Sequence, residues 1–276
     1  MKELIEYHRF LRVRGLKVRY LDAGDGDPIL LLHGIGHSIR AWGRAMPALA
    51  EAGFRALAID TPGFGFSEQP PAMWGEDDLV AFLDEFLDTF YLDQVSVAGH
   101  SLGGAFAAVY ALHRPQRVKK LVLAAAAVGP DVTPALRLLT LQVAQPLLRP
   151  VALRQVFSLL AGSWDEEVLE QELKDAQRWL ADPAARVYFW NVLRMGLRVR
   201  GVKPDFLLLE RLRELRMPVL VAWGERDQIL PVSNLEKIRA VLPKARYETF
   251  PEGGHMITYE EPARFNRVLI EFLRET

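Results

Sequence analysis

The sequence contains no cysteine among its 276 residues, which excludes thiol nucleophiles, thiolate metal sites and disulfide bonds. It also has no uninterrupted apolar run of the roughly 18 residues that a membrane-spanning helix needs. Segment 1–6 lacks the apolar stretch of a signal peptide. A formal net charge of −1 offers no attraction to nucleic acid or to an anionic membrane. These absences lead us to expect a cytoplasmic protein. We also expect a small-molecule partner and a monomer or a homodimer.

Hydrophobic residues make up 50% of the chain and charged residues 25%, so a sizeable core can be buried. Strand and helix patterns alternate before residue 129 and again after residue 217, which indicates crossover connections. We therefore expect an α/β fold with about eight strands in a mostly parallel sheet, helices on both faces and a hairpin around Arg14-Gly15 at one edge. The expected strands are residues 7–13, 16–22, 29–32, 54–59, 95–98, 119–125, 219–223 and 245–250. The expected helices are 76–91, 105–112, 233–241, 262–273 and one that Ser38 caps, with Trp42, Met46 and Leu49 on its apolar face.

The alternation stops between residues 129 and 217, where no strand signal is present. Ligands of open α/β sheets bind beyond the carboxyl ends of the strands, which is where a helical insertion is best placed. We expect residues 129–217 to form an all-helical cap over a core made of 1–128 and 218–276. The alternative is a docking surface for another chain. The helical patterns of the insertion are separated by prolines and cover residues 135–148, 151–160, 166–180 and 184–197.

One motif joins a β-branched apolar strand to a helix rich in small residues. It is Gly99–Gly103, a G-x-S-x-G arrangement with Ser101 at its centre. The glycines permit a sharp turn that raises the Ser101 hydroxyl above the sheet, and such strained geometry persists where a site needs it. Ser101 is therefore the candidate nucleophile. The motif alone also fits an ordinary strand–loop–helix connection in which this spacing arose by chance.

A serine hydroxyl needs a base that removes its proton, and the base needs an acid that orients it. His255 is the candidate base among six histidines, because it lies in a glycine loop directly after the last expected strand. His33 follows an earlier strand, and we expect it to brace its loop. His100 adjoins Ser101 but is expected to point away from it. No motif surrounds the remaining histidines, which are His8, His37 and His113.

Asp227 is the candidate acid. It follows the strand that precedes the histidine loop, and the order Ser, Asp, His along the chain is the hydrolase arrangement. Glu225 is a nearby competitor, and Asp131 is a distant one. Asp60 also follows a strand, where we expect it to hold the next turn.

Two backbone N–H groups are expected to hold a developing oxyanion. Leu102 directly follows the candidate nucleophile and supplies one of them, and Ile35 in the loop His33–Gly36 supplies the other. This loop could also be interpreted as a phosphate site, but no Lys-Ser or Lys-Thr pair follows it. The expected chemistry uses no metal ion and no cofactor.

Five motifs in this order resemble the α/β-hydrolase family over nearly the whole chain outside the insertion. The serine at position 101 argues against haloalkane dehalogenases and epoxide hydrolases, which use aspartate there. The segment that follows His255 looks more like that of carboxylesterases and lipases. C–C-bond hydrolases of ring-cleavage products share the scaffold, but they typically carry asparagine where His100 stands and an aromatic residue in place of Met256. The five motifs are His33–Gly36, Asp60–Ser67, Gly99–Gly104, Gly224–Asp227 and Gly254–His255.

The resemblance implies a serine hydrolase that cleaves carboxylic esters of small to medium acyl chains through an acyl-enzyme. Alternatives on the same triad are a C–C hydrolase, a perhydrolase and a lyase, and the non-enzymatic alternative is a hydrolase-like ligand receptor. The first half of the insertion carries more apolar side chains than one face of each helix requires. We expect part of them to line an acyl pocket, with contact to another subunit or to a lipid surface as the alternatives. The expected pocket residues are Leu139, Val143, Leu147 and Met256.

Overall fold

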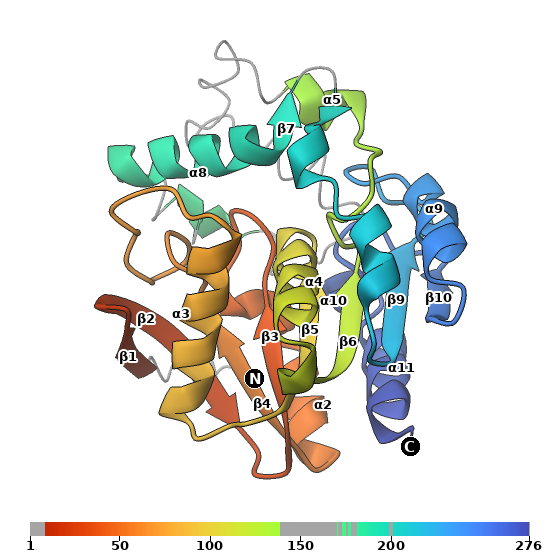
Figure 1. Ribbon diagram of the computed structural model, residues 1–276, viewed down its shortest axis with the longest axis horizontal. Helices are drawn as coiled ribbons and strands as arrows, with labels where there is room; N and C mark the ends of the chain where they lie inside the picture. Colours follow the sequence, from red (N-terminus) through yellow and green to blue (C-terminus); the bar gives the residue numbers. More distant parts are fainter. Residues whose placement is uncertain are drawn as a thin grey trace.

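An eight-stranded sheet forms the centre of the computed structural model (Figure 1). The structure describes residues 9–138, 170, 173–174, 176–177, 181–198 and 201–275. β2 runs antiparallel to both of its neighbours, and every other adjacent pair in the order β1-β2-β4-β3-β5-β6-β9-β10 is parallel. The predicted mostly parallel sheet with a hairpin at one edge is confirmed. The strands are β1 (Arg9–Val13), β2 (Leu16–Ala23), β3 (Asp27–Leu32), β4 (Phe54–Ile59), β5 (Val95–His100), β6 (Val118–Ala124), β9 (Val219–Gly224) and β10 (Arg246–Phe250).

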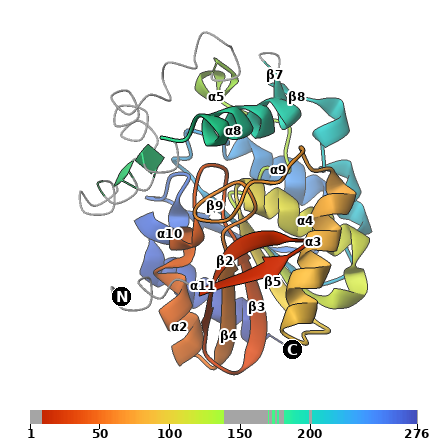
Figure 2. The same cartoon turned by 90° about the vertical axis from the view of Figure 1, so that its left-hand side faces the viewer.

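The sheet separates two hydrophobic cores, because alternate side chains of each strand point to opposite faces. In β3, Leu30 and Leu32 enter the first core while Ile29 and Leu31 enter the second. Helices therefore lie on both faces, as predicted (Figure 2). The first core is covered by α3 (Glu76–Thr89), α4 (Leu102–His113) and α9 (Ser233–Val241). The second is covered by η1 (Ile39–Trp42), α2 (Ala45–Glu51), α10 (Ile257–Glu260) and α11 (Pro262–Arg274).

The single helix predicted after Ser38 is divided in two. Ser38 caps η1, where its Oγ accepts a hydrogen bond from the Arg40 N–H at 3.3 Å. The chain then leaves the helix at residues 43–44 before α2 begins, and the glycine at position 43 has a low helix propensity. Trp42 and Met46 are nevertheless buried as expected, because both segments face the second core.

The insertion between β6 and β9 is only partly helical in the described residues. Its helices α5 (Pro134–Leu138) and α8 (Pro183–Gly196) fall within or beside two of the predicted ones. The prediction of an all-helical cap is wrong, because an antiparallel ladder joins β7 (Leu197–Arg198) to β8 (Gly201–Val202). Strands of two residues carry no periodic pattern, so nothing marks them in the sequence. The predicted helix 151–160 and most of 135–148 and 166–180 lie outside the described residues. The chain returns to the core through two short 3-10 helices, η4 (Pro204–Phe206) and η5 (Glu210–Glu214).

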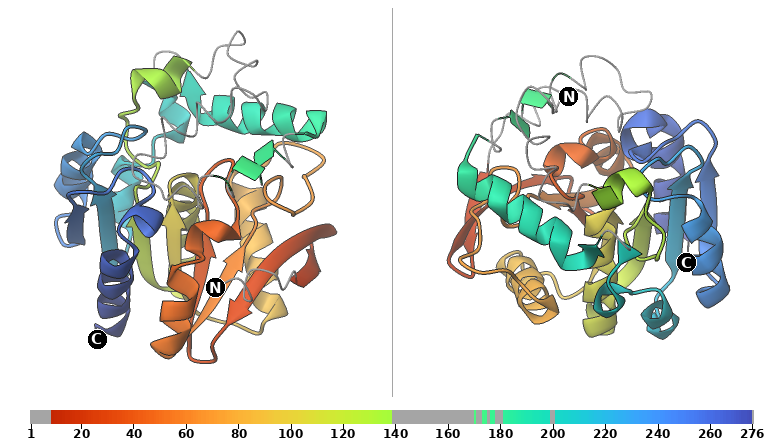
Figure 3. Two further views of the ribbon diagram at one scale, coloured as in Figure 1. Left: turned by 180° about the vertical axis from the view of Figure 1, so that it is seen from behind. Right: turned by 90° about the horizontal axis from the view of Figure 1, so that it is seen from above.

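Helix α8 lies beyond the end of the sheet from which the insertion leaves β6 (Figures 1 and 3). Its buried Tyr188 packs on the loop after β4. A Cβ at Gly63 would come within 2.0 Å of the Tyr188 ring, and the centroid of the Phe64 ring lies 5.8 Å from that of Tyr188. The division of the chain into a core and a cap at 128/129 and 217/218 stays a prediction.

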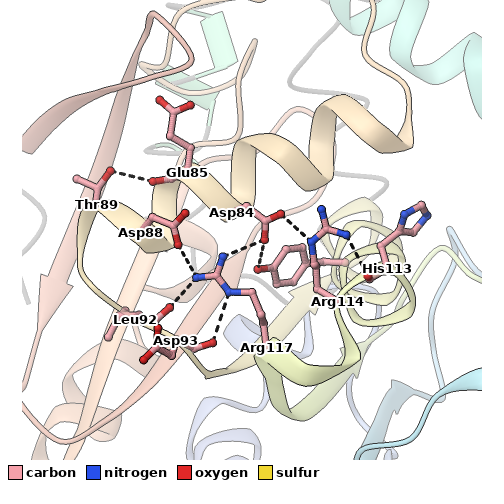
Figure 4. A network of polar contacts seen from close by, with 10 residues as sticks. Asp84, Glu85, Asp88, Thr89, Leu92, Asp93, His113, Arg114 and Arg117 are labelled. Carbon is pink, nitrogen blue, oxygen red and sulfur yellow. Dashed lines mark hydrogen bonds and ion pairs between the residues drawn. The ribbon is translucent and has the colours of Figure 1, made fainter.

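A polar network holds the C-terminal end of α4 in place (Figure 4). Asp84 of α3 accepts hydrogen bonds from the Tyr110 hydroxyl at 2.9 Å and from the guanidinium groups of Arg114 and Arg117 at 2.8 and 3.0 Å. Arg117 also pairs with Asp88 at 2.7 Å. Burial raises the pKa of Tyr110, so its hydroxyl remains a donor. Such a connected network fixes geometry better than isolated surface ion pairs do, and it holds α4 against α3.

Candidate active site

Ser101 occupies the sharp turn between β5 and α4. Its backbone has a φ of 54° and a ψ of −119°, a costly conformation for a residue other than glycine. Hydrogen bonds hold this conformation: the Ser101 N–H donates to the Ala124 carbonyl at 3.0 Å, and the Ser101 carbonyl accepts from the Ala127 N–H at 2.9 Å. The turn therefore has the strained geometry that its motif predicts.

The glycines on either side of Ser101 are required by close packing. A Cβ at Gly99 would lie 2.1 Å from the Gly103 carbonyl oxygen, and a Cβ at Gly103 would lie 2.3 Å from the Leu32 carbonyl oxygen. Real Cβ atoms essentially never approach other atoms so closely. The first turn of α4 therefore packs directly on the end of β3, where the loop of the predicted oxyanion site begins.

His255 and Asp227 meet in space. The Nδ1 of His255 lies 2.8 Å from Oδ2 of Asp227, whose side chain is fully buried. The other carboxylate oxygen, Oδ1, accepts the backbone N–H groups of Ile229 at 2.8 Å and Leu230 at 2.9 Å. These donors hold the carboxylate in place, and an imidazole that donates to it from Nδ1 leaves Nε2 as an acceptor.

Within the described residues, neither alternative acid contacts His255. Glu225 is exposed to solvent. Asp131 pairs with Lys237 at 2.6 Å and accepts a hydrogen bond from the Ser233 hydroxyl at 2.7 Å. The hydrogen bond from Lys237 lowers the pKa of Asp131. The geometry therefore favours Asp227 as the partner of the histidine.

Asp60 is a structural carboxylate, as expected. It forms a buried ion pair with Arg19 at 2.7 Å. It also accepts the N–H groups of Ile39 at 2.7 Å and Phe66 at 2.8 Å. These contacts join β2, the start of η1 and the turn after β4, so the carboxylate has no oxygen left for a role in catalysis.

The loops that follow β9 and β10 lie in direct contact. A Cβ at Gly224 would lie 2.0 Å from the Gly254 carbonyl oxygen, so only glycine fits there. The Arg226 N–H donates to the Gly253 carbonyl at 2.9 Å. This close approach follows from the parallel pairing of the two strands, and it brings Asp227 and His255 within hydrogen-bond reach.

His100 joins the loop that carries His255 to the turn that carries Ser101. Its Nε2 donates to the His255 carbonyl at 2.9 Å, and the centroids of the two imidazole rings lie 4.9 Å apart. Because His100 directly precedes Ser101, this contact links the His255 loop to the turn that carries the candidate nucleophile. Burial, together with the nearby His255, lowers the pKa of His100 well below its usual 6.5, so it remains a neutral donor. No sequence motif predicts this hydrogen bond to the His255 carbonyl. The position of His100 next to Ser101 is the one feature of the sequence that points to a role in the site.

The two N–H groups predicted to hold an oxyanion donate no hydrogen bond within the described part of the chain. Leu102 is the first residue of α4, so its N–H has no acceptor in the helix. Ile35 follows Gly34, where a Cβ would lie 3.0 Å from the Ser101 Cβ, so this loop lies against Ser101. The assignment of the two groups as an oxyanion hole stays a prediction.

His33 braces the same loop, as expected. Its Nδ1 donates to the Gly34 carbonyl at 2.8 Å, and its Nε2 accepts from the Thr61 N–H at 2.9 Å. The Gly34 carbonyl belongs to the peptide that carries the Ile35 N–H, so His33 fixes the orientation of that donor. Desolvation lowers the pKa of His33 from 6.5 to about 4, which keeps the ring neutral near pH 7.

We expect this buried neutral histidine to weaken the fold in acid. As the pH falls from 6.5 to about 4, the unfolded chain binds a proton at His33 that the folded chain does not, so the free energy of unfolding decreases. The shift corresponds to about 3 kcal/mol. Urea unfolding of the wild type and of His33→Gln at a series of pH values measures the effect. The stability advantage of the wild type should shrink as the pH falls, and a constant difference would contradict this assignment.

Three of the predicted pocket residues, Leu139, Val143 and Leu147, lie outside the described residues. Met256 is 4% exposed and packs in the second core, so its role in a pocket stays a prediction. Among the described residues, no group of three or more His, Cys, Asp or Glu side chains could hold a metal ion. Across the same ranges, no helix has the length and apolar character needed to cross a membrane.

This chain is similar to known hydrolases in sequence and fold. A family model described as the alpha/beta hydrolase fold matches residues 27–262. A 2-hydroxy-6-oxononadienedioate/2-hydroxy-6-oxononatrienedioate hydrolase of Paraburkholderia phymatum is 32% identical over 270 residues, covering 94% of this chain and 91% of that protein. A solved meta-cleavage product hydrolase from Pseudomonas fluorescens IP01 has a TM-score of 0.80 at 24% identity, with 98% of each chain covered. A thermophilic esterase from Thermogutta terrifontis has a TM-score of 0.77 at 23% identity, with 96% of this chain and 98% of that chain covered.

The two solved structures are less than 25% identical to this chain and show the fold alone. The family model spans all five motifs on which the resemblance rests. The relative from Paraburkholderia phymatum adds sequence similarity over most of the length of both proteins. The prediction of a hydrolase is supported at this level, and the chain belongs to the α/β-hydrolase family.

Proposed function

We propose that the protein hydrolyses carboxylic esters through Ser101, His255 and Asp227. The observation that carries the proposal is the 2.8 Å contact between His255 Nδ1 and the buried Asp227 carboxylate. This pair is linked to the turn that carries Ser101, because His100, the residue before Ser101, donates to the His255 carbonyl. A serine hydroxyl becomes a nucleophile when a base accepts its proton, and an oriented acid makes that base effective.

Acylation begins when His255 Nε2 accepts the Ser101 proton while the Ser101 oxygen bonds to the ester carbonyl carbon. The carbonyl oxygen becomes an oxyanion, which the N–H groups of Ile35 and Leu102 stabilise. Its collapse breaks the bond to the alcohol oxygen, which takes the proton from His255 and leaves. Water then attacks the acyl-enzyme with the help of the same histidine and releases the acid. Asp227 stays ionised and stabilises the imidazolium.

Two positions support an ester substrate over a ring-cleavage product. C–C hydrolases of this family typically carry asparagine where His100 stands and an aromatic residue in place of Met256. Both positions adjoin the proposed base: His100 donates to the His255 carbonyl, and Met256 follows His255 and is buried in the second core. The chain therefore departs from the C–C hydrolase pattern at the base itself.

C–C bond hydrolysis of a 2-hydroxy-6-oxo-dienoate is the second candidate. The name of the relative from Paraburkholderia phymatum, which is 32% identical to this chain, favours it. The same nucleophile, base and acid would serve both reactions, so a comparison of substrates separates them.

The insertion 129–217 is proposed as the cap that shapes the substrate pocket. Helix α8 lies beyond the end of the sheet at which the site loops emerge (Figure 3). Its Tyr188 packs against Gly63 and Phe64 in the loop after β4, whose Thr61 contacts His33. The pocket would then lie between the insertion and Ser101.

A panel of p-nitrophenyl esters from acetate to palmitate tests the proposed reaction. We expect kcat/KM to rise from acetate towards acyl chains of roughly six to eight carbons, because each buried methylene contributes about 0.8 kcal/mol. The matched comparison is kcat/KM for 2-hydroxy-6-oxononadienedioate. A kcat/KM that is higher for the dienoate than for the best ester would identify C–C hydrolysis as the reaction. A kcat/KM that falls steadily as the acyl chain lengthens from acetate would reject the acyl pocket.

A further inference from the structure

Asn234, in the first turn of α9, is a buried amide that uses both of its polar atoms. The residue is 1% exposed. Its Nδ2 donates to the Asp131 carbonyl at 2.9 Å, and its Oδ1 accepts from the Asp131 N–H at 3.0 Å. The chain passes so close that a Cβ at Gly129 would lie 2.3 Å from Oδ1. Asn234 therefore holds the segment 129–133, where the insertion leaves the core.

The segment held by Asn234 is bonded to the loop that carries the proposed acid. Thr133 donates its N–H to the Ile229 carbonyl at 3.2 Å. The N–H groups of Ile229 and Leu230 in turn donate to Asp227 Oδ1 at 2.8 and 2.9 Å. A path of hydrogen bonds, joined by the short chain segment from Asp131 to Thr133, thus leads from the Asn234 amide to the Asp227 carboxylate.

The side chain of Asp131 makes a separate set of contacts. Its carboxylate pairs at 2.6 Å with Lys237, whose side chain is 43% exposed. Exposed ion pairs contribute little to stability. Loss of the Asn234 amide, in contrast, leaves the Asp131 N–H and carbonyl without their buried partners, which costs more. Asp131 therefore offers two contacts that can be removed independently, one through its backbone and one through its side chain.

We infer that Asn234 is a positioning residue, which holds segment 129–133 so that the Asp227 loop presents its carboxylate to His255. This inference rests on the proposed function, because it gives Asp227 the role of the acid. Without the amide, the segment can shift, and the acid loses the support that holds it 2.8 Å from His255 Nδ1. A misplacement of about 1 Å at a reacting centre costs about 100-fold in rate. Asn234 thereby makes the orientation of the Asp227 carboxylate depend on the position of the first residues of the insertion.

Asn234→Ala and Lys237→Gln form the matched test. We expect Asn234→Ala to lower kcat on the best ester by roughly 10- to 100-fold while KM changes less than about threefold, because the base is misoriented and the substrate contacts remain. Lys237→Gln removes the exposed ion pair and keeps the backbone bonds, so its kcat should stay within about twofold of wild type. An unchanged kcat in Asn234→Ala, or an equal loss in both variants, would overturn the inference.

Thr133→Pro provides a second variant, because it removes the N–H that joins the segment to the acid loop. We expect the same loss of kcat. The low-field NMR signal of the proton between His255 and Asp227 gives a readout that needs no turnover. It should shift in Asn234→Ala and in Thr133→Pro and keep its position in Lys237→Gln, and an unchanged signal in the first two would reject the inference. A wild type that hydrolyses neither ester nor dienoate would refute the proposed function, while the signal would still decide the role of Asn234.

Discussion

Replacing Ser101 by alanine is expected to abolish hydrolysis and to leave the fold intact. Without the nucleophile, only oxyanion stabilisation and substrate binding remain, so kcat should fall by about four to six orders of magnitude. Within the described part of the chain the Ser101 hydroxyl makes no hydrogen bond, so its removal leaves no partner unsatisfied. The backbone bonds that hold the turn do not involve the side chain. Thermal unfolding should therefore match that of the wild type.

The measurement is kcat on the best substrate of the panel, with thermal unfolding as the control. A Ser101→Ala variant that keeps a tenth of the wild-type kcat would exclude Ser101 as the nucleophile. A wild type that shows one acylation event and no turnover would instead identify a ligand receptor.

Asp227→Asn should cause the second largest loss, about four orders of magnitude in kcat. The asparagine Oδ1 can still accept the N–H groups of Ile229 and Leu230, so the loop keeps its shape. Its Nδ2 then faces His255 Nδ1 as a donor, which forces the imidazole proton onto Nε2, where the serine proton should go.

Glu225→Gln is the matched control for Asp227→Asn, because it makes the same chemical change two residues away on an exposed side chain. We expect its kcat to stay within about twofold of wild type. The opposite pattern, with the large loss in Glu225→Gln, would move the role of the acid to Glu225.

The elements that carry the site can be predicted from the sequence because local patterns specify them. Gly99–Gly103 marks the turn, since no larger residue fits at either end of the motif. Asp227 and His255 each follow a strand of β-branched and aromatic residues, and parallel strands bring their carboxyl ends to one edge of the sheet. Their contact at 2.8 Å follows from this topology.

The contacts that orient these residues are not predictable in the same way, because they join distant parts of the chain. His100 contacts a carbonyl 155 positions away, and the Asn234 amide pairs with a peptide 103 positions away. No sequence pattern indicates which distant group either residue contacts. The interruption of the predicted helix at Gly43 and the strands β7 and β8 each involve only two residues. Such short segments show no recognisable period in the sequence.

The second hydrophobic core has a consequence for how the protein is made. Its cover comes from both ends of the chain, with η1 and α2 from the early part and α10 and α11 from the late part. The early and late parts touch, since the Asn266 side chain donates to the Arg44 carbonyl at 2.8 Å. During synthesis on the ribosome, the apolar underside of the central strands therefore stays open until α11 has emerged, and a nascent chain must be protected from aggregation until then. His255 emerges just before this helix, so the growing chain acquires its proposed base and closes its surface at nearly the same moment.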